Sequence, residues 1–230
     1  LQNMFPSPTA VLIRLGYTVY FDGFSGQAET LMQYSGAASS QFFVAADDSI
    51  YDATAGGTAG AADITGLTNA RIQYVNNTTA GGSYIQGVNG ADKAVIYDGS
   101  TWHRDGDGGA YDITGVDSAD CIGIFMSHNR VWLIEVGTLK AWYLPTGAIG
   151  GAAQALDLSS IADRGGYLMA GISWTQDAGY GMDDMTAFIT SNGELIVYRG
   201  TDPSSATTWA LIGVYWMGSP IGRRCLVKYG

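Results

Sequence analysis

The sequence predicts an all-β protein in which one small antiparallel sheet is repeated along the chain. Three observations lead to this prediction. The chain has 33 glycines in 230 residues, and glycine supplies the positive φ angles that tight hairpins require. Of its 21 acidic residues, 18 are Asp, which favours turns, and only three are Glu, which favours helices. Short apolar runs also recur at a nearly constant spacing, with turn residues between them.

Tyrosines at the ends of comparable apolar runs define the spacing. Tyr97 follows Tyr51 by 46 residues, and Tyr143 follows Tyr97 by another 46. Tyr198 comes 55 residues later, so we expect an insertion near residues 175–184. Each tyrosine ends the second strand of an expected hairpin, and Asn-Gly turns support two of these hairpins. One further run precedes each hairpin and another follows it, so the repeated unit is four short strands.

A four-stranded unit of this length is typical of a β-propeller blade. One such sheet cannot cover both of its own faces, whereas sheets arrayed around an axis cover one another. We therefore expect a propeller of four-stranded antiparallel blades. The blades are expected near residues 28–67, 70–116, 120–159 and 166–217, with a partial fifth at 221–230.

The two ends of the chain are expected to meet in the last blade. Strands expected within residues 10–21 would pair with the partial strand at 221–230, so residues 1–230 would form a single propeller domain of five or more blades. Closing the ring in this way would hold the first and last blades together. A β-sandwich followed by a second β-domain is the alternative fold.

Charge and composition narrow the range of partners. Only 14% of the residues are charged, which indicates either a surface covered by partner chains or a plain polar β surface. The net charge of −10 argues against tight binding to a nucleic-acid backbone, although DNA could pass nearby. We expect no membrane anchor, because no run of 18 apolar residues occurs. The chain begins without Met, and we expect it to be part of a longer protein.

The residues that most often carry catalysis are scarce and lie outside known motifs. Cys121 and Cys225 fit no metal or redox spacing and are expected to be buried free thiols. His103 and His128 are expected to be ordinary loop histidines, with His128 at a hairpin turn where His tolerates an unusual φ. No H-E-x-x-H, C-x-x-C or G-x-S-x-G motif occurs. We therefore expect no enzyme active site and no cofactor.

Two loops contain possible binding residues. Asp105 and Asp107 alternate with glycines and could present oxygens to Ca²⁺, but the segment lacks the third oxygen position and the Glu of an EF-hand, so a solvated turn is the main expectation. Arg223 and Arg224 follow Gly222 and could bind acidic residues of a neighbouring chain, with a solvated turn as the alternative. The six tryptophans mostly fall in or beside expected strands, which indicates packing between blades.

Several short segments resemble one class of phage protein. They are residues 3–8 (NMFPSP), 14–17 (RLGY), 29–32 (ETLM), 90–92 (GAD), 139–145 (LKAWYLP), 200–204 (GTDPS) and 220–224 (PIGRR). On these segments the chain resembles structural proteins of the tail-nozzle and packaged-DNA-stabilisation type. The resemblance implies a β-propeller subunit of a homo-oligomeric ring, of six copies by family expectation, at the head–tail connector or tail tip. It also implies contacts with other tail or connector proteins, DNA that passes without specific binding, and a place in the virion after assembly in the host cytoplasm.

The sequence is compatible with three functions. The first is a structural subunit of a phage tail nozzle or head–tail connector ring, which acts by assembly and forms part of the DNA passage. The second is a propeller module of a virion that binds a glycan or a receptor through aromatic loops. The third is a propeller glycosidase, which would need two carboxylates about 5–10 Å apart across a pocket.

Overall fold

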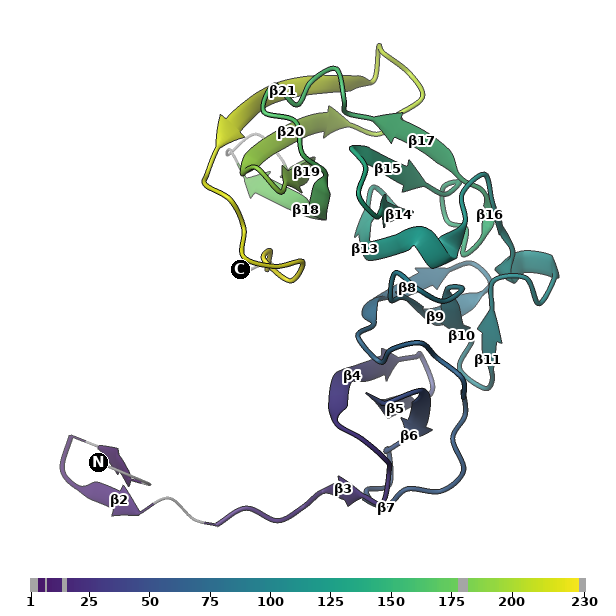
Figure 1. Ribbon diagram of the computed structural model, residues 1–230, viewed down its shortest axis with the longest axis vertical. Coiled ribbons are helices and arrows are strands. Elements are labelled where there is room, and N and C mark those ends of the chain that lie inside the picture. The colour runs from purple at the N-terminus through teal and green to yellow at the C-terminus, as the bar shows by residue number, and fades with distance from the viewer. Residues whose placement is uncertain (1–3, 7, 14–15, 178–181, 228–230) are drawn as a thin grey trace.

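The fold is all β and consists of antiparallel sheets that follow one another in an arc (Figure 1). The computed structural model describes residues 4–6, 8–13, 16–177 and 182–227. Within these ranges no α-helix occurs, and only two short 3-10 turns, η1 (Gly109–Tyr111) and η2 (Ser118–Asp120), interrupt the strands. None of the described segments forms a helix able to cross a membrane. The all-β prediction is confirmed.

Four sheets, numbered here in chain order, make up the body. Sheet 1 consists of β4 (Ala28–Ser35), β5 (Ser40–Ala46) and β6 (Ser49–Asp52). Sheet 2 consists of β8 (Gln73–Thr79), β9 (Gly82–Val88), β10 (Val95–Tyr97) and β11 (Trp102–Arg104). Sheet 3 consists of β13 (Cys121–Ser127), β14 (Arg130–Glu135), β15 (Lys140–Tyr143) and β17 (Gln154–Asp157). Sheet 4 consists of β18 (Leu168–Asp177), β19 (Met182–Thr190), β20 (Glu194–Gly200) and β21 (Trp209–Trp216).

Every sheet is a meander whose first strand lies on the inner side of the arc. Figure 1 shows β4, β8, β13 and β18 along the inside, while β11, β17 and β21 lie outside. β13 packs beside both β8 and β18, so neighbouring sheets meet through their inner strands. Tight turns link the strands within each sheet: Asp47, His128 and Asn129 all have φ angles near +55°, as two-residue hairpin loops require. The predicted unusual φ at His128 is confirmed.

Aromatic side chains fill the spaces between neighbouring sheets. Trp132 of sheet 3 is 1% exposed, and its ring lies 5.5 Å from that of Phe188 and 5.8 Å from that of Trp209, both of sheet 4. Between sheets 1 and 2, Phe43 lies 4.8 Å from Tyr97, again measured between ring centres. Rings of this size bury a large apolar area and favour edge or offset contacts. These contacts hold the successive sheets together.

Two of the expected fourth strands are placed differently. The strand expected at the end of the first blade is reduced to a single bridge between Ile50 and Ile64, so sheet 1 has three strands. In sheet 2 the fourth strand is β11, because the turn at Asp98 reverses the chain directly after β10. The later segment forms only β12 (Ile113–Thr114), which pairs in parallel with β16 (Gly151–Ala152) and links the loops of sheets 2 and 3.

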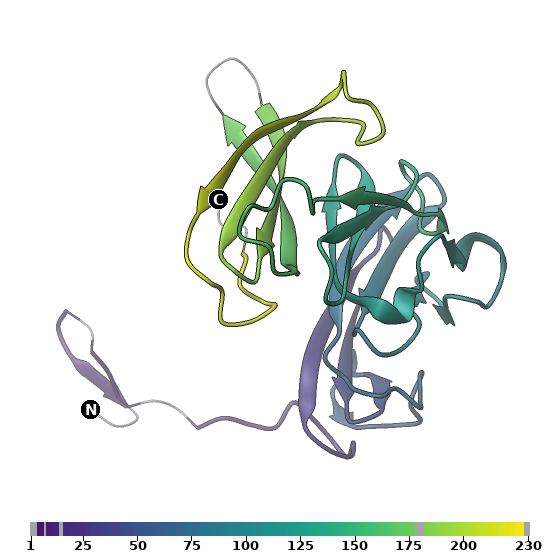
Figure 2. The same ribbon diagram turned by 45° about the horizontal axis from the view of Figure 1, so that its top comes forward.

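The expected joining of the two chain ends is wrong. β1 (Met4–Pro6) and β2 (Val11–Ile13) pair with each other as a hairpin that lies away from the sheets (Figure 2). β3 (Phe21–Asp22) pairs with β7 (Gly57–Thr58). Residues 221–227 form no strand, and the rest of the expected fifth blade, 228–230, lies outside the described residues. The physical reason is that the C-terminal segment turns inward and bonds to the inner strands, as described below.

The predicted insertion is a long hairpin. β18 and β19 pair without interruption from Ala170 and Ile189 out to Asp177 and Met182. The tip of this hairpin, residues 178–181, lies outside the described residues. The extra length of the fourth unit therefore extends a hairpin that the sequence had already indicated.

The two ends of the arc differ in how they are covered. On sheet 1, the face turned away from sheet 2 carries Val44 and Ala46, which are covered by a cluster that includes Phe21 and Phe24. On sheet 4, the face turned away from sheet 3 carries a smaller apolar cluster, formed by Ile172, Met185, Ala187, Leu195 and Val197. The strand register adds Trp174 and Tyr215 to this face, and they are 47% and 50% exposed. We call this surface the sheet 4 end face.

Candidate functional site

A concavity lies on the inner side of the arc, where the C-terminal segment returns to the first sheets. After β21 the chain leaves the outer edge of sheet 4 and runs toward the middle of the arc (Figure 1). There it encloses, with β4, β8 and the loops beside them, a cavity of about 890 Å³. The lining residues are Gln27, Ala28, Glu29, Asn69, Arg71, Gln73, Asn89, Gly90, Ile122, Gly222, Arg223 and Arg224. We call it the arginine cavity.

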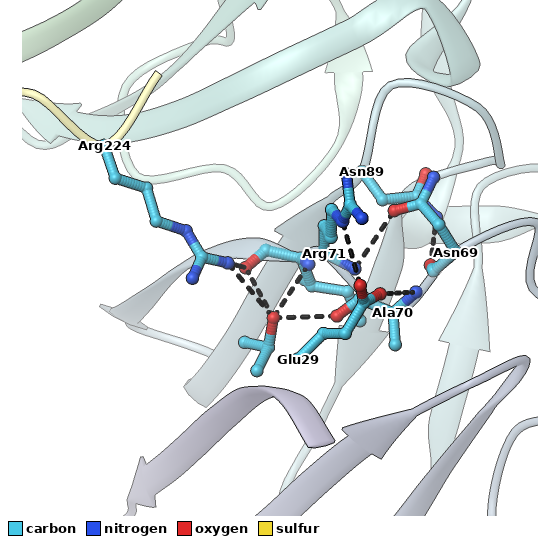
Figure 3. A network of polar contacts seen from close by, with 8 residues as sticks. Glu29, Asn69, Ala70, Arg71, Asn89 and Arg224 are labelled. Carbon is cyan, nitrogen blue, oxygen red and sulfur yellow. Dashed lines mark hydrogen bonds and ion pairs between the residues drawn. The ribbon is translucent and has the colours of Figure 1, made fainter. Parts of the chain in front are cut away.

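Arg224 fixes the C-terminal segment to the junction of sheets 1 and 2 (Figure 3). Its Nη2 donates to Thr30 Oγ1 at 3.2 Å and to the carbonyl oxygen of Ile72 at 3.3 Å. Thr30 Oγ1 in turn donates to the carbonyl oxygen of Ala70 at 2.7 Å and accepts from the Ile72 amide at 3.0 Å. Thr30 is 6% exposed, so its hydroxyl is a buried junction for three segments of the chain.

Glu29 and Arg71 form an ion pair at the cavity wall. Arg71 Nε donates to Glu29 Oε1 at 2.9 Å, and the Ala70 amide donates to Glu29 Oε2 at 3.2 Å (Figure 3). The Arg71 side chain is 76% exposed, whereas that of Glu29 is 24% exposed. Within the described ranges, the two Nη groups of Arg71 and the whole guanidinium of Arg223 have no hydrogen-bond acceptor. Unused donors of two arginines therefore line this cavity.

An asparagine-glycine loop, Asn89 and Gly90, forms another part of the cavity lining. Asn89 Nδ2 donates to the carbonyl oxygen of Asn69 at 2.9 Å and to Asp92 Oδ2 at 2.6 Å. Gly90 has a φ of 75°, and a Cβ at this position would lie 2.7 Å from Ile122 Cγ2. Glycine is thus required twice, once for the backbone conformation and once for the close approach to sheet 3.

The arginine cavity is positive although the chain is strongly negative. Its lining has three arginines and one glutamate, in a chain with a net charge of −10. Guanidinium groups present planar pairs of N–H donors that match the two oxygens of a carboxylate or phosphate. The donors that line the cavity therefore suit an anionic group.

The structure places both arginines that the sequence analysis selected at this cavity. Arg224 bonds within its own chain, whereas Arg223 is exposed, and their binding to acidic residues of a neighbouring chain stays a prediction. Glu29 and Arg71 were not predicted as site residues. They are 42 residues apart, and no local pattern marks them as partners.

The two aspartates proposed for Ca²⁺ have separate structural roles. Asp105 is 6% exposed, and its oxygens accept from the Ile113 amide at 2.8 Å and from Ser118 Oγ at 2.6 Å, with Lys93 Nζ at 3.6 Å. Asp107 accepts from the Arg104 amide at 2.7 Å. Among the described residues, no group of three or more His, Cys, Asp or Glu side chains could hold a metal ion.

The two histidines stabilise local structure. His103 lies in β11, not in a loop as expected, and its ring stacks on Tyr111 at 3.8 Å with Nε2 3.2 Å from Asp98 Oδ2. Burial acts to raise the pKa of Asp98, but hydrogen bonds from Thr101, Ser100 and His103 outweigh it, and the pKa lies below its ordinary value. His128 joins sheets 3 and 4 through its Nε2, 3.1 Å from the carbonyl oxygen of Asp184.

Two expectations about buried side chains need correction. Cys121 is buried, and burial raises the pKa of its thiol to about 12, but Cys225 is exposed because the C-terminal segment forms no strand. Trp174 is 47% exposed, because it lies on the sheet 4 end face with no sheet beyond it. Trp216 is 66% exposed and lies on the opposite face, at the end of β21, beside Arg164. The other tryptophans pack as predicted or are half-buried.

Comparisons with known proteins add little to this picture. No family model and no curated protein matches the chain. Two crystal structures of BBS1N in complex with ARL6DN are similar, both with a TM-score of 0.39. The lead-soaked one is 13% identical, over 83% of this chain and 67% of that chain; the mercury-soaked one is 11% identical, over 90% and 69%. Similarity at this level indicates neither a shared function nor a shared partner.

Proposed function

We propose that this chain forms part of a β-propeller and acts as a structural subunit of a bacteriophage ring, at the tail nozzle or head–tail connector. It acts by assembly and contributes to the wall of the DNA passage. The observation that carries the proposal is the sheet 4 end face. An apolar sheet face of this kind is stable in water only when another surface covers it.

The composition of the sheet 4 end face supports an assembly role. Trp174 and Tyr215 are about half exposed there. Ile172 lies beside Trp174 along β18, and Leu195 of β20 pairs with Tyr215 of β21, both partly exposed. Covering apolar surface contributes about 25 cal/mol per Å². The outer strand β21 is also an edge strand, whose free backbone groups could pair with another strand. In a propeller, a further sheet would take this place, supplied by more of the same protein or by a neighbouring subunit.

Charge supports the same proposal. The net charge of −10 suits a wall past which DNA must move, because excess carboxylates repel phosphates. The segments that resemble tail-nozzle and connector proteins add to this argument, and a closed ring is the form that such assemblies take. A place in the virion and contacts with other tail or connector proteins follow from this proposal.

The test is to measure the size and shape of the purified protein. Mass photometry and negative-stain electron microscopy should show a ring, and Trp174→Ser with Tyr215→Ser should shift the population toward single subunits. Tyr17→Ser is the control, since Tyr17 is 86% exposed but lies between β2 and β3, in no strand of sheet 4. A protein that stays monomeric at all concentrations, with no effect of the sheet 4 variants, would contradict the proposal.

One alternative has an observation in its favour. Trp174 and Tyr215 are exposed aromatic residues on one face, which a glycan-binding module would also need. A glycan array separates the two functions. Binding that the same two substitutions abolish, in a protein that remains monomeric, would support the receptor-binding module and overturn the ring.

A further inference from the structure

We propose that the arginine cavity binds a carboxylate-rich segment of another protein chain. The proposal does not depend on assembly through the sheet 4 end face, because none of the residues that line the cavity belongs to that face. It rests on the donors available in the cavity, on the size of the cavity and on the lack of aromatic residues in its lining.

Two guanidinium groups in the cavity have unused donors. Arg223 has five N–H groups without an acceptor among the described residues, and Arg71 keeps its two Nη groups free while its Nε holds Glu29. The three arginines of the cavity repel one another, and Glu29 neutralises only one of their charges. An added carboxylate would reduce this repulsion, so the cavity favours an anion. A carboxylate can accept two parallel N–H bonds from one guanidinium, which gives both strength and orientation.

The cavity already contains an example of the bond that we propose. Glu29 receives Arg71 Nε on one oxygen and the Ala70 amide on the other. Its carboxylate thus occupies one part of the polar wall, with both oxygens bonded. An incoming Asp or Glu would use the remaining donors in the same way.

The size of the cavity fits a short peptide. About 890 Å³ lies within the range of about 300–1,000 Å³ that is usual for ligand sites. The amide side chains of Gln27, Gln73 and Asn69 line it as well, and amides both donate to and accept from a peptide backbone. Ile122 supplies an apolar patch on the floor.

A nucleic acid fits this cavity less well than a peptide. None of its lining residues is aromatic, so unpaired bases would find no ring to stack on.

The experiment uses three labelled probes and the purified protein in low salt. The probes are a ten-residue poly-aspartate peptide, the matched poly-asparagine peptide and a ten-nucleotide oligothymidine, each followed by fluorescence anisotropy. We expect poly-aspartate to bind at least tenfold more tightly than either of the others, and added salt to weaken its binding. The double variant Arg71→Gln with Arg223→Gln should bind poly-aspartate at least tenfold more weakly than the wild type does.

Controls separate binding from folding and from total charge. Arg164→Gln removes one charge outside the cavity, where Arg164 lies over the Trp216 ring, and is compared with Arg223→Gln alone, which removes one charge inside it. Arg164→Gln should leave binding within about twofold of the wild type. Arg224 is left intact because it bonds to Thr30, and the Arg71–Glu29 pair that the double variant loses is largely exposed on the Arg71 side, so the melting temperature should stay within a few degrees of the wild type. Arg223→Lys retains the charge but loses the planar pair of donors, so its affinity for poly-aspartate should lie between that of Arg223→Gln and that of the wild type.

Three results would overturn the proposal. The first is no binding of poly-aspartate up to millimolar peptide. The second is poly-aspartate binding that Arg164→Gln weakens as much as the cavity variant does, which would show attraction by charge alone. The third is oligothymidine binding as tight as that of the peptide, which would assign the cavity to nucleic acid.

Discussion

Replacing Thr30 by Val tests whether the inner junction holds the sheets together. Val has nearly the shape of Thr, so the substitution leaves no cavity and removes only the hydroxyl. Three bonds are lost with it: to the carbonyl oxygen of Ala70 at 2.7 Å, from the Ile72 amide at 3.0 Å and from Arg224 Nη2 at 3.2 Å. Each buried neutral bond is worth about 1 kcal/mol net, and one to a charged group about 1.5–3 kcal/mol.

All three separated partners keep another bond. The Ile72 amide and the carbonyl oxygen of Ala70 still lie 3.0 Å apart, and Arg224 still donates to the carbonyl oxygen of Ile72 at 3.3 Å. We therefore expect Thr30→Val to lower the free energy of unfolding by about 3 kcal/mol, somewhat less than the full sum of about 3.5–5 kcal/mol. For a chain of this size, that corresponds to a fall in melting temperature of about 6–12 °C.

Urea unfolding followed by tryptophan fluorescence measures the change, and the chain has six tryptophans as reporters. A loss of this size moves the midpoint by about 1 M urea. The control is Thr114→Val, because Thr114 is an exposed strand residue whose hydroxyl makes no hydrogen bond in the described part of the chain. Equal midpoints for the Thr30 and Thr114 variants would refute the junction. So would strict additivity of Thr30→Val with Arg224→Gln, because bonded neighbours should couple.

Three further predictions concern the core, the acidic turns and the thiols. Trp132→Ala should cost about 3–5 kcal/mol of unfolding free energy, whereas Trp132→Phe should cost clearly less, because Trp132 Nε1 has no hydrogen-bond partner within the described ranges; denaturant midpoints measure both. The pKa of Asp98 in the folded state lies below its ordinary value of 3.8, so the ionised carboxylate stabilises the fold fully above pH 3.8 and this stabilisation is lost as the pH falls below 3.8. The Asp98→Asn variant lacks this ionisation and should therefore lose less stability than the wild type between about pH 5 and about pH 3. Urea titrations at each pH measure the difference. An aromatic disulfide reagent should modify one thiol, Cys225, in the native protein and the second, Cys121, only in denaturant; two fast thiols in the native state would contradict the burial of Cys121.

The local pattern of the sequence predicted most of the strands. The tyrosine spacing located the hairpins because Tyr97, Tyr143 and Tyr198 each lie within or end a strand of the same rank in its sheet. Strand alternation and turn residues act over a few neighbours, so they are visible without the fold. The fourth strand of sheet 2 was misplaced because the Asp98 turn is held by side-chain bonds, which allow β11 to follow at once.

Contacts between distant segments could not be predicted in the same way. Arg71 and Glu29 meet only because β4 and β8 lie side by side, and Arg224 is 194 residues from Thr30. The prediction of a closing blade was wrong for the same reason, because pairing of the chain ends depends on the long-range contacts of the last segment, which local patterns do not reveal. The exposed Cys225 and the exposed Trp174 follow from that one difference.

The Arg224 contact also bears on how the protein folds. Each sheet otherwise packs on its immediate neighbours, so most of the arc can form step by step from contacts close in sequence. The C-terminal segment, by contrast, makes a contact between residues 194 positions apart, so we expect it to take its place late, after the first and the last sheet have formed. Hydrogen exchange at the inner ends of β4 and β8 should therefore depend on residues synthesised long after those strands.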